Sequence, residues 1–334
     1  MKLIGTNLLK PGEKLASAVY SASGKVIVNE GIVITETYID KFKKLSIYNI
    51  YVDDDNYDDI ELVEAISIKT RAQAYQAFRQ VYDLFHKGKS FDEYAIVDAV
   101  KQVVDEIISK GTTSISTLSS MVIDNYLAGH SVNVCILSIL IGNNMNYNFN
   151  QLLDLGVGAL IHDIARREES KESIDHIQKG FEVIKRYRGI SLHSSKVIYE
   201  HHENCDGSGY PRGIEGGSIS QFSKIVSIVD FYDTLTLGSD GKPQMLPHEA
   251  FEVILAESDK RFDAETVERF RNAIAIYPNG CVVKLSNGQK GVVVTQNKGV
   301  PHRPVVRIVE GKEIRKDVNL ITNLTIFIEK VDVE

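Results

Sequence analysis

Residues 199–211 read YEHHENCDGSGYP, with two adjacent histidines and a glutamate ahead of a loop rich in Asp, Gly and Ser. Neighbouring residues on a helix diverge by about 100°, so two adjacent imidazoles reach one site most easily where a helix ends. Asp and Gly permit the tight turn that such an end needs. We therefore expect His201 and His202 to stand at a helix end and to find their partners elsewhere in the chain.

The bulk composition is that of an ordinary globular protein. A length of 334 residues predicts two or three domains. The net charge of −7 argues against a general binder of DNA, RNA or membrane surfaces. Three widely spaced cysteines indicate a reducing compartment, and the N-terminus shows no secretory signal. The most apolar stretch, VNVCILSILIG, is too short to span a bilayer. We expect a cytoplasmic protein without a membrane partner.

The pattern of hydrophobic residues predicts a multidomain chain. Residues 1–60 have short β-branched runs and one amphipathic helix, which predict a small α/β accessory domain. Residues 61–110 predict a helical linker, and residues 111–278 an all-α domain of strongly apolar helices. After Pro278 the sequence changes to strands, so residues 279–334 predict a small β domain.

Ionisable groups interrupt the apolar helices of the predicted all-α domain. His130 opens the most apolar helix, His162 and Asp163 follow another, and Asp230 interrupts KIVSIVDFY. A single buried histidine is more often a core residue than a ligand, but a buried carboxylate needs a partner. Five imidazoles and two acids in one apolar region favour a metal site. His and Asp without a cysteine pattern suit iron, manganese or zinc.

The order of these residues resembles the HD-GYP family of the HD phosphohydrolase superfamily. The matching text is GHSVNV (129–134), LIHDIAR (160–166), IDHIQKGFEVI (174–184), EHHENCDGSGYPRGI (200–214), SIVDFYDTLT (227–236) and RFDAETVERF (261–270). The resemblance implies an all-α HD-type catalytic domain at 111–278, flanked by the small α/β and β units. It also implies a cyclic di-GMP phosphodiesterase that forms linear pGpG, with further cleavage to GMP left open.

The resemblance also implies the ligands of two divalent metal ions, with iron preferred and manganese as the alternative. One ion would be held by His130, His162, Asp163 and Asp230, and the second by Asp163, His176, His201 and His202. The acidic residue that some members carry four positions before the first histidine is Tyr126 here, which favours two ions over three.

The predicted contacts with substrate depart from the family pattern. Arg166 replaces the lysine of the family's HD-x-x-K motif, and arginine suits phosphate binding better than acid catalysis. We assign Asp163 and Arg166 as catalytic residues, and Arg166, Tyr210 and Lys242 as substrate-binding residues. The segment between Asp163 and His176 is short, and LGSDGKPQ replaces the family's basic segment.

Three functions remain open at this point. The first is a metal-dependent phosphodiesterase for cyclic di-GMP. The second is a degenerate HD-GYP protein that acts as a cyclic-dinucleotide or metal-dependent sensor or interaction module with little turnover. The third is an HD phosphohydrolase for another nucleotide. A homodimer, or a signalling-protein partner bound through the GYP loop, is a further expectation.

Overall fold

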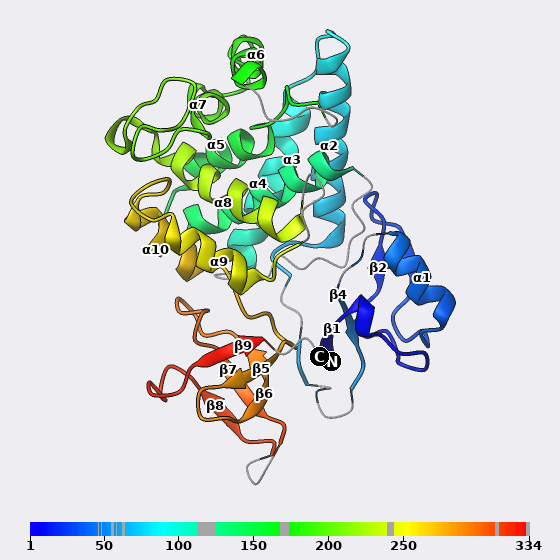
Figure 1. Ribbon diagram of the computed structural model, residues 1–334. Coiled ribbons are helices and arrows are strands. Elements are labelled where there is room, and N and C mark those ends of the chain that lie inside the picture. The colour runs from blue at the N-terminus through cyan, green and yellow to red at the C-terminus, as the bar shows by residue number, and fades with distance from the viewer. Residues whose placement is uncertain are drawn as a thin grey trace. The chain divides into compact units, whose positions relative to one another are not determined.

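The computed structural model describes residues 1–45, 47, 49–54, 57, 59–61, 64–111, 125–167, 174–238, 244–310 and 314–331. These residues form two compact units, coloured along the chain in Figure 1. The first unit is formed mainly by residues 1–64 and 274–334. The second contains residues 65–111 and 125–273 of the described chain. Helices predominate in the second unit and strands in the first, which confirms the predicted multidomain fold class.

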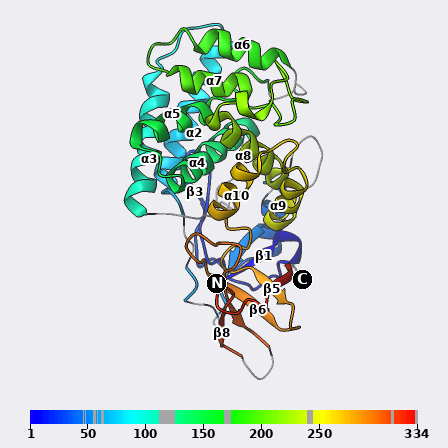
Figure 2. The same cartoon turned by 90° about the vertical axis from the view of Figure 1, so that its left-hand side faces the viewer.

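The helical unit is built around one buried apolar helix. Its elements are α2 (Ile68–His86), α3 (Tyr94–Lys110), α4 (Tyr126–Asn144), α5 (Phe149–Leu160), α6 (Ile174–Ile184), α7 (Leu192–Glu200), α8 (Gln221–Leu237), α9 (Pro247–Ala256) and α10 (Ala264–Ala273). Helix α4 packs against α2, α3, α5, α8 and α10, as the two views of Figures 1 and 2 show. Apolar side chains occur all round α4 because neighbouring helices cover all of its sides.

Helix α4 is longer than its most apolar stretch suggested. It has 19 residues and a mean hydropathy of 1.3 over its most apolar window, which by length and composition is enough to cross a bilayer. However, 89% of that window is buried inside the protein, as in the central helix of a soluble domain. The side chain of Asn125 caps the start of α4 by accepting a hydrogen bond from the Ala128 amide at 2.9 Å.

Helices α2 and α3 belong to the helical unit, although the sequence placed them in a linker at 61–110. Their apolar faces carry Phe78, Val81, Ile96, Val100 and Val103, all of which are buried. These faces pack against each other and against α4 and α5. The amphipathic pattern of these helices therefore reflects burial against the central helices.

The first unit contains small antiparallel sheets. Its N-terminal part has β1 (Lys2–Gly5), the 3-10 helix η1 (Thr6–Leu8), β2 (Val19–Tyr20), β3 (Val26–Val28), α1 (Glu36–Lys44) and β4 (Asn49–Val52). Strand β1 pairs with β4, and β2 pairs with β3. The C-terminal part is a five-stranded sheet in the order β8-β7-β6-β5-β9. Its strands are β5 (Val282–Leu285), β6 (Lys290–Thr295), β7 (Val305–Ile308), β8 (Asp317–Asn319) and β9 (Ile328–Val331). The domain limit near residue 278 stays a proposal, supported by the change from helices to strands after α10.

Candidate metal centre

The predicted metal ligands come from three helices and two turns of the helical unit. His130 lies in the first turns of α4, His176 in α6 and Asp230 in α8. His162 and Asp163 lie in the turn that follows α5. Helix α7 ends at Glu200 with His201 as its C-cap, so the adjacent histidines stand at a helix end, as expected. The fold therefore brings together residues that are up to 100 positions apart in the sequence.

These side chains form two groups in which one donor atom of each residue lies within 4.8 Å of the others. The first group contains His130, His162 and Asp230, and the second contains Asp163, His176, His201 and His202. All seven residues are buried. The groups adjoin each other, since the rings of His162 and His201 have centroids 5.0 Å apart. We call them the His130 cluster and the His176 cluster.

Asp163 lies between the two clusters. Its Oδ1 is 3.2 Å from Nε2 of His176 and 3.6 Å from Nε2 of His201. Its Oδ2 is 3.8 Å from Nε2 of His162. In the His130 cluster, Oδ1 of Asp230 lies 3.0 Å from Nε2 of His130 and 3.7 Å from Nε2 of His162. One carboxylate thus offers an oxygen to each cluster, which is the arrangement a bridging ligand requires.

Hydrogen bonds at Nδ1 fix the orientation of several histidine rings. Nδ1 of His162 donates to the Ala159 carbonyl at 2.8 Å, and Nδ1 of His201 donates to the Ile198 carbonyl at 3.0 Å. A backbone carbonyl only accepts, so the proton of each neutral ring must be on Nδ1. The lone pair on Nε2 is then left for another partner. This is the usual way in which proteins prepare histidines for metal binding.

The electrostatic balance of the site keeps the carboxylates ionised. Burial alone would raise the pKa of Asp163, but His162, His176, His201 and Arg166 outweigh it and hold that pKa well below its usual range. Burial likewise opposes ionisation of Asp230, and His130 and His162 hold its pKa well below its usual range. Burial lowers the pKa of His202 well below its ordinary value, so this imidazole is neutral near pH 7.

The donor atoms fit divalent metal ions. Among the described residues, Nε2 of His130, His162, His201 and His202 is buried without a hydrogen-bond partner, and so is Oδ1 of Asp163. Leaving this many buried polar atoms unsatisfied costs free energy, and a bound cation would satisfy them together. Nitrogen and oxygen donors of this kind suit iron, manganese or zinc.

Residues 157–266 match the family described as HD domain. This segment contains every residue of the two clusters except His130, and it also contains the HHE and GYP sequences. The chain therefore contains an HD domain, and its HHE and GYP sequences resemble those of the HD-GYP family. Residues 282–334 match the family described as a KOW domain associated with HD domain, which covers the C-terminal sheet.

Several curated relatives are similar to this chain over part of its length. The chain is 26% identical over 257 residues to the cyclic di-GMP phosphodiesterase PA4108 of Pseudomonas aeruginosa, covering 72% of this chain and 60% of the relative. It is 28% identical over 229 residues to the cyclic di-GMP phosphodiesterase PdeB of Borreliella burgdorferi, covering 62% and 60%. It is 26% identical over 170 residues to the 3'3'-cGAMP-specific phosphodiesterase 3 of Vibrio cholerae, covering 46% and 36%. The chain thus spans at most 60% of the length of these relatives.

The predicted substrate residues have different positions. Arg166 is buried, and its NH1 donates to Oδ2 of Asp163 at 3.0 Å, so its guanidinium is directly beside the clusters. Tyr210 is half-buried and stacks on the ring of His202, with centroids 4.9 Å apart and planes inclined by 23°. Lys242 lies outside the described residues. Arg166 and Tyr210 therefore each contact a residue of the His176 cluster, Asp163 and His202 respectively.

Two buried glutamates hold the GYP loop against the end of α7. Glu200 accepts hydrogen bonds from Arg212, from the Ser220 amide at 3.0 Å and from the Ser223 hydroxyl at 3.1 Å. Glu203 accepts from the backbone amides of Arg212 and Ile214, at 2.8 and 3.2 Å. The glutamate of HHE thus orders the loop that carries Tyr210.

Gly209 is required by close backbone packing in this loop. A Cβ atom at position 209 would lie 2.3 Å from the Asn204 nitrogen and 2.5 Å from the His202 carbonyl oxygen. These atoms are backbone and cannot move aside without displacing His202. The glycine of GYP therefore allows the loop to pack directly against a predicted ligand.

Sequence reasoning missed two kinds of supporting residue. Oδ2 of Asp233 accepts a hydrogen bond from Nδ1 of His130 at 2.8 Å. Asp233 follows Asp230 by three residues on α8, and a second acid on the same buried helix face was an available signal. His86 is half-buried, and its Nε2 donates to the Ile164 carbonyl at 3.0 Å. That partner is 78 residues away, so no local pattern indicated the contact.

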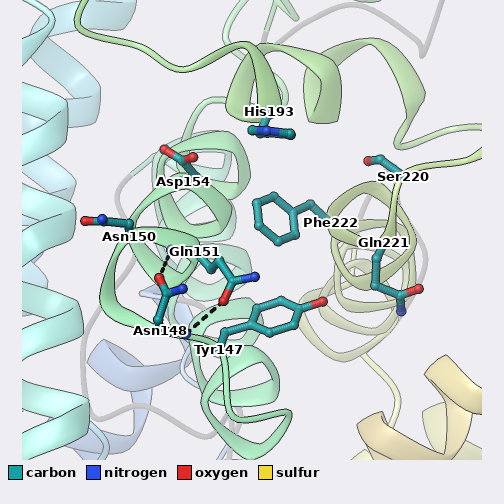
Figure 3. A pocket seen from close by; sticks show the side chains of 9 residues that line it. All are labelled: Tyr147, Asn148, Asn150, Gln151, Asp154, His193, Ser220, Gln221 and Phe222. Atoms are coloured by element: carbon teal, nitrogen blue, oxygen red, sulfur yellow. Dashed lines mark hydrogen bonds between the residues drawn. The ribbon is translucent and has the colours of Figure 1, made fainter.

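His193 lies outside both clusters. Figure 3 shows it at the edge of a pocket of about 490 Å³, above the ring of Phe222. The pocket is lined by residues near the starts of α5, α7 and α8, and none of them is a predicted metal ligand. The His193 side chain is exposed and belongs to neither cluster.

Proposed function

We propose that this chain is a metal-dependent phosphodiesterase that hydrolyses cyclic di-GMP to linear pGpG. The observation that carries the proposal is the division of seven buried donor residues into two adjoining clusters with Asp163 between them. The curated relatives named as cyclic di-GMP phosphodiesterases support the choice of substrate. Competent side chains at all seven positions favour turnover over a sensor without activity.

The proposed cofactor is a pair of divalent ions, with iron preferred and manganese as the alternative. His130, His162 and Asp230 would hold one ion, and His176, His201 and His202 the other, with Asp163 shared. Tyr126 supports two ions: it lies four residues before His130 and stacks on it, with centroids 5.7 Å apart and planes inclined by 6°. A phenol is a poorer metal ligand than the carboxylate that some family members carry at this position.

Such a metal pair supplies Lewis acidity and an activated water for in-line hydrolysis of a phosphodiester. The chain contributes the orientation of the reacting groups. Water adds to phosphorus and the ribose 3' oxygen leaves, so one P–O bond forms and one breaks, and pGpG keeps a 5' phosphate. The ionised carboxylates of Asp163 and Asp230 and the neutral ring of His202 are in the protonation states that metal binding requires.

Arg166 and Tyr210 are proposed to hold the substrate. The guanidinium of Arg166 donates to Oδ2 of Asp163 beside the clusters, and its planar charged group suits a phosphate oxygen. Tyr210, stacked on His202, offers an aromatic face beside the His176 cluster for a guanine base. Lys242 remains a predicted phosphate contact. A second cleavage to GMP is a further proposal that depends on whether pGpG can bind again.

The proposed location is the cytoplasm, where cyclic dinucleotide signals are made and degraded. All three cysteines are free thiols, which supports a reducing compartment. Dimerisation, or a protein partner at the GYP loop, stays a prediction.

An anaerobic activity screen over several cyclic dinucleotides tests this function, with metal content measured on the same sample. We expect cyclic di-GMP to be linearised faster than 3'3'-cGAMP in the presence of Mn²⁺ or Fe²⁺. Tight binding of cyclic di-GMP without turnover would favour the sensor, and faster hydrolysis of another nucleotide would reassign the substrate.

A further inference from the structure

A row of three buried polar contacts leads from α2 to His130. NH1 of Arg71 donates to Oδ1 of Asn133 at 2.6 Å, and Nδ2 of Asn133 donates to Oδ1 of Asp233 at 3.0 Å. Oδ2 of Asp233 then accepts from Nδ1 of His130 at 2.8 Å. All four side chains are buried, and they come from α2, α4 and α8. Arg71 lies far outside the matched HD segment at 157–266.

The direction of each hydrogen bond in this row follows from the first residue. A guanidinium has only donors, so the Asn133 atom that faces Arg71 must be the carbonyl oxygen. The amide nitrogen of Asn133 must then face Asp233 as a donor. Oδ1 of Asp233 thus accepts from Asn133, and when this carboxylate is ionised its Oδ2 accepts from Nδ1 of His130. Nε2 of His130 faces Oδ1 of Asp230 at 3.0 Å, so with Nδ1 turned to Asp233 it is the ring nitrogen available to a metal ion at the His130 cluster.

Without Arg71, nothing in this row would fix the orientation of the Asn133 amide. The amide could rotate by 180° and present its oxygen to the carboxylate of Asp233, where two acceptors repel each other. Asp233 would then lose a donor, and His130 would be free to turn or to carry its proton on Nε2. A ring protonated at Nε2 cannot bind a metal through that atom.

We propose that Arg71 is a positioning residue for the metal centre, acting through Asn133 and Asp233 to hold Nε2 of His130 ready for a metal ion. The proposal rests on the binuclear centre proposed above. Helix α2 carries none of the seven predicted ligands, yet through Arg71 it would control the orientation of His130. Removing the partners that orient a metal-binding histidine typically weakens metal affinity about 10- to 100-fold.

The test is a titration of chelator-treated full-length protein with Mn²⁺ alone. Arg71→Met should weaken the affinity for one of two Mn²⁺ ions about 10- to 100-fold and leave the other unchanged. Arg71→Lys, which keeps a residue that only donates, should bind both ions nearly as tightly as the wild type. Lys69→Met removes an exposed cation from the same helix and should change neither affinity.

Asn133→Asp provides an independent variant of almost the same shape. It keeps an oxygen for Arg71 but places a second acceptor against Asp233, so it should show the same selective loss of one ion. Unlike Arg71→Met, it creates no large cavity, and it therefore decides the question if Arg71→Met does not fold. The His176→Gln background, in which only the His130 cluster remains, identifies which ion is affected.

Two results would overturn the inference in distinguishable ways. If wild-type protein binds two Mn²⁺ ions and Asn133→Asp binds both with the same affinities, the row has no positioning role and the metal centre stands. If the wild type binds no Mn²⁺ at all, the proposed metal centre fails, and this inference fails with it.

Discussion

Oδ1 of Asp163 lies 3.2 Å from Nε2 of His176, while Oδ2 of the same carboxylate faces His162 in the other cluster at 3.8 Å. Each histidine, in contrast, offers its Nε2 atom to one cluster. The two clusters should therefore be separable by substitution at a histidine and linked by substitution at Asp163.

Single histidine substitutions should each remove one metal ion. We expect His176→Gln and His130→Gln to lower the metal content from about two ions per chain to about one, since each change leaves the other cluster intact. Elemental analysis of the purified variants measures this directly. His193→Gln, at the exposed pocket of Figure 3, is the control and should keep both ions. Loss of both ions from His130→Gln would mean that the clusters do not act separately.

Gly209→Ala should disrupt the GYP loop and the His176 cluster. The added Cβ would meet backbone atoms at 2.3 and 2.5 Å, one of them the carbonyl oxygen of His202. We expect one metal ion to be lost and the Tm to fall. Gly217→Ala is the matched control, because a Cβ there meets nothing within 4 Å. Equal metal contents in the two variants would show that the loop does not position His202.

Glu200→Ala should destabilise the protein by about 2–4 kcal/mol, because it leaves Arg212, the Ser220 amide and the Ser223 hydroxyl without their buried acceptor. Urea unfolding measures the change. Glu182→Ala removes an exposed glutamate paired with Lys185 and should change stability by less than about 0.5 kcal/mol. A Glu200→Ala protein as stable as the Glu182→Ala protein would contradict this role.

His86 should contribute to the loss of stability in acid. Burial lowers its pKa below the ordinary value of a free histidine, although the Ile164 carbonyl opposes the shift. At pH values between the pKa of His86 in the folded protein and its ordinary pKa in the unfolded chain, the unfolded chain binds more protons than the folded protein. The free energy of unfolding therefore rises with pH in this range and falls on acidification. His86→Gln keeps a donor for Ile164 and removes the titration.

Urea unfolding of metal-free protein at several pH values from 5 to 7.5 checks this prediction. The free energy of unfolding should depend less steeply on pH in His86→Gln than in the wild type. The difference in slope should correspond to the uptake of less than one proton on unfolding, because His86 is only half-buried. His193→Gln, which removes an exposed histidine, serves as the control. A steeper dependence in His86→Gln would contradict the assigned sign.

The sequence indicated the seven clustered residues better than the residues that surround them. Ionisable residues inside apolar helices are a local signal, and the structure brings all seven of them together. Asp233 and Asn133 each follow a predicted ligand by three residues and share its helix face, so that spacing could have indicated them. Arg71 could not be found this way, because its helix reads as an ordinary amphipathic one and its partner is 62 residues away.

The fold, too, could be predicted from local sequence patterns but not where it depends on long-range contacts. Strong apolar periodicity predicted the helical core, and the change after Pro278 predicted the C-terminal sheet. The membership of α2 and α3 in the helical unit depends on packing against α4 and α5, which no local pattern contains. Only such long-range contacts distinguish a linker helix from a helix that packs into the domain.

The most direct test of the central claim is the metal content of anaerobically purified protein, wild type beside Asp163→Asn. The account predicts about two iron or manganese ions per wild-type chain and almost none in Asp163→Asn, because that side chain serves both clusters. A wild-type protein that holds no metal under any expression condition, or an Asp163→Asn protein that keeps both ions, would contradict it.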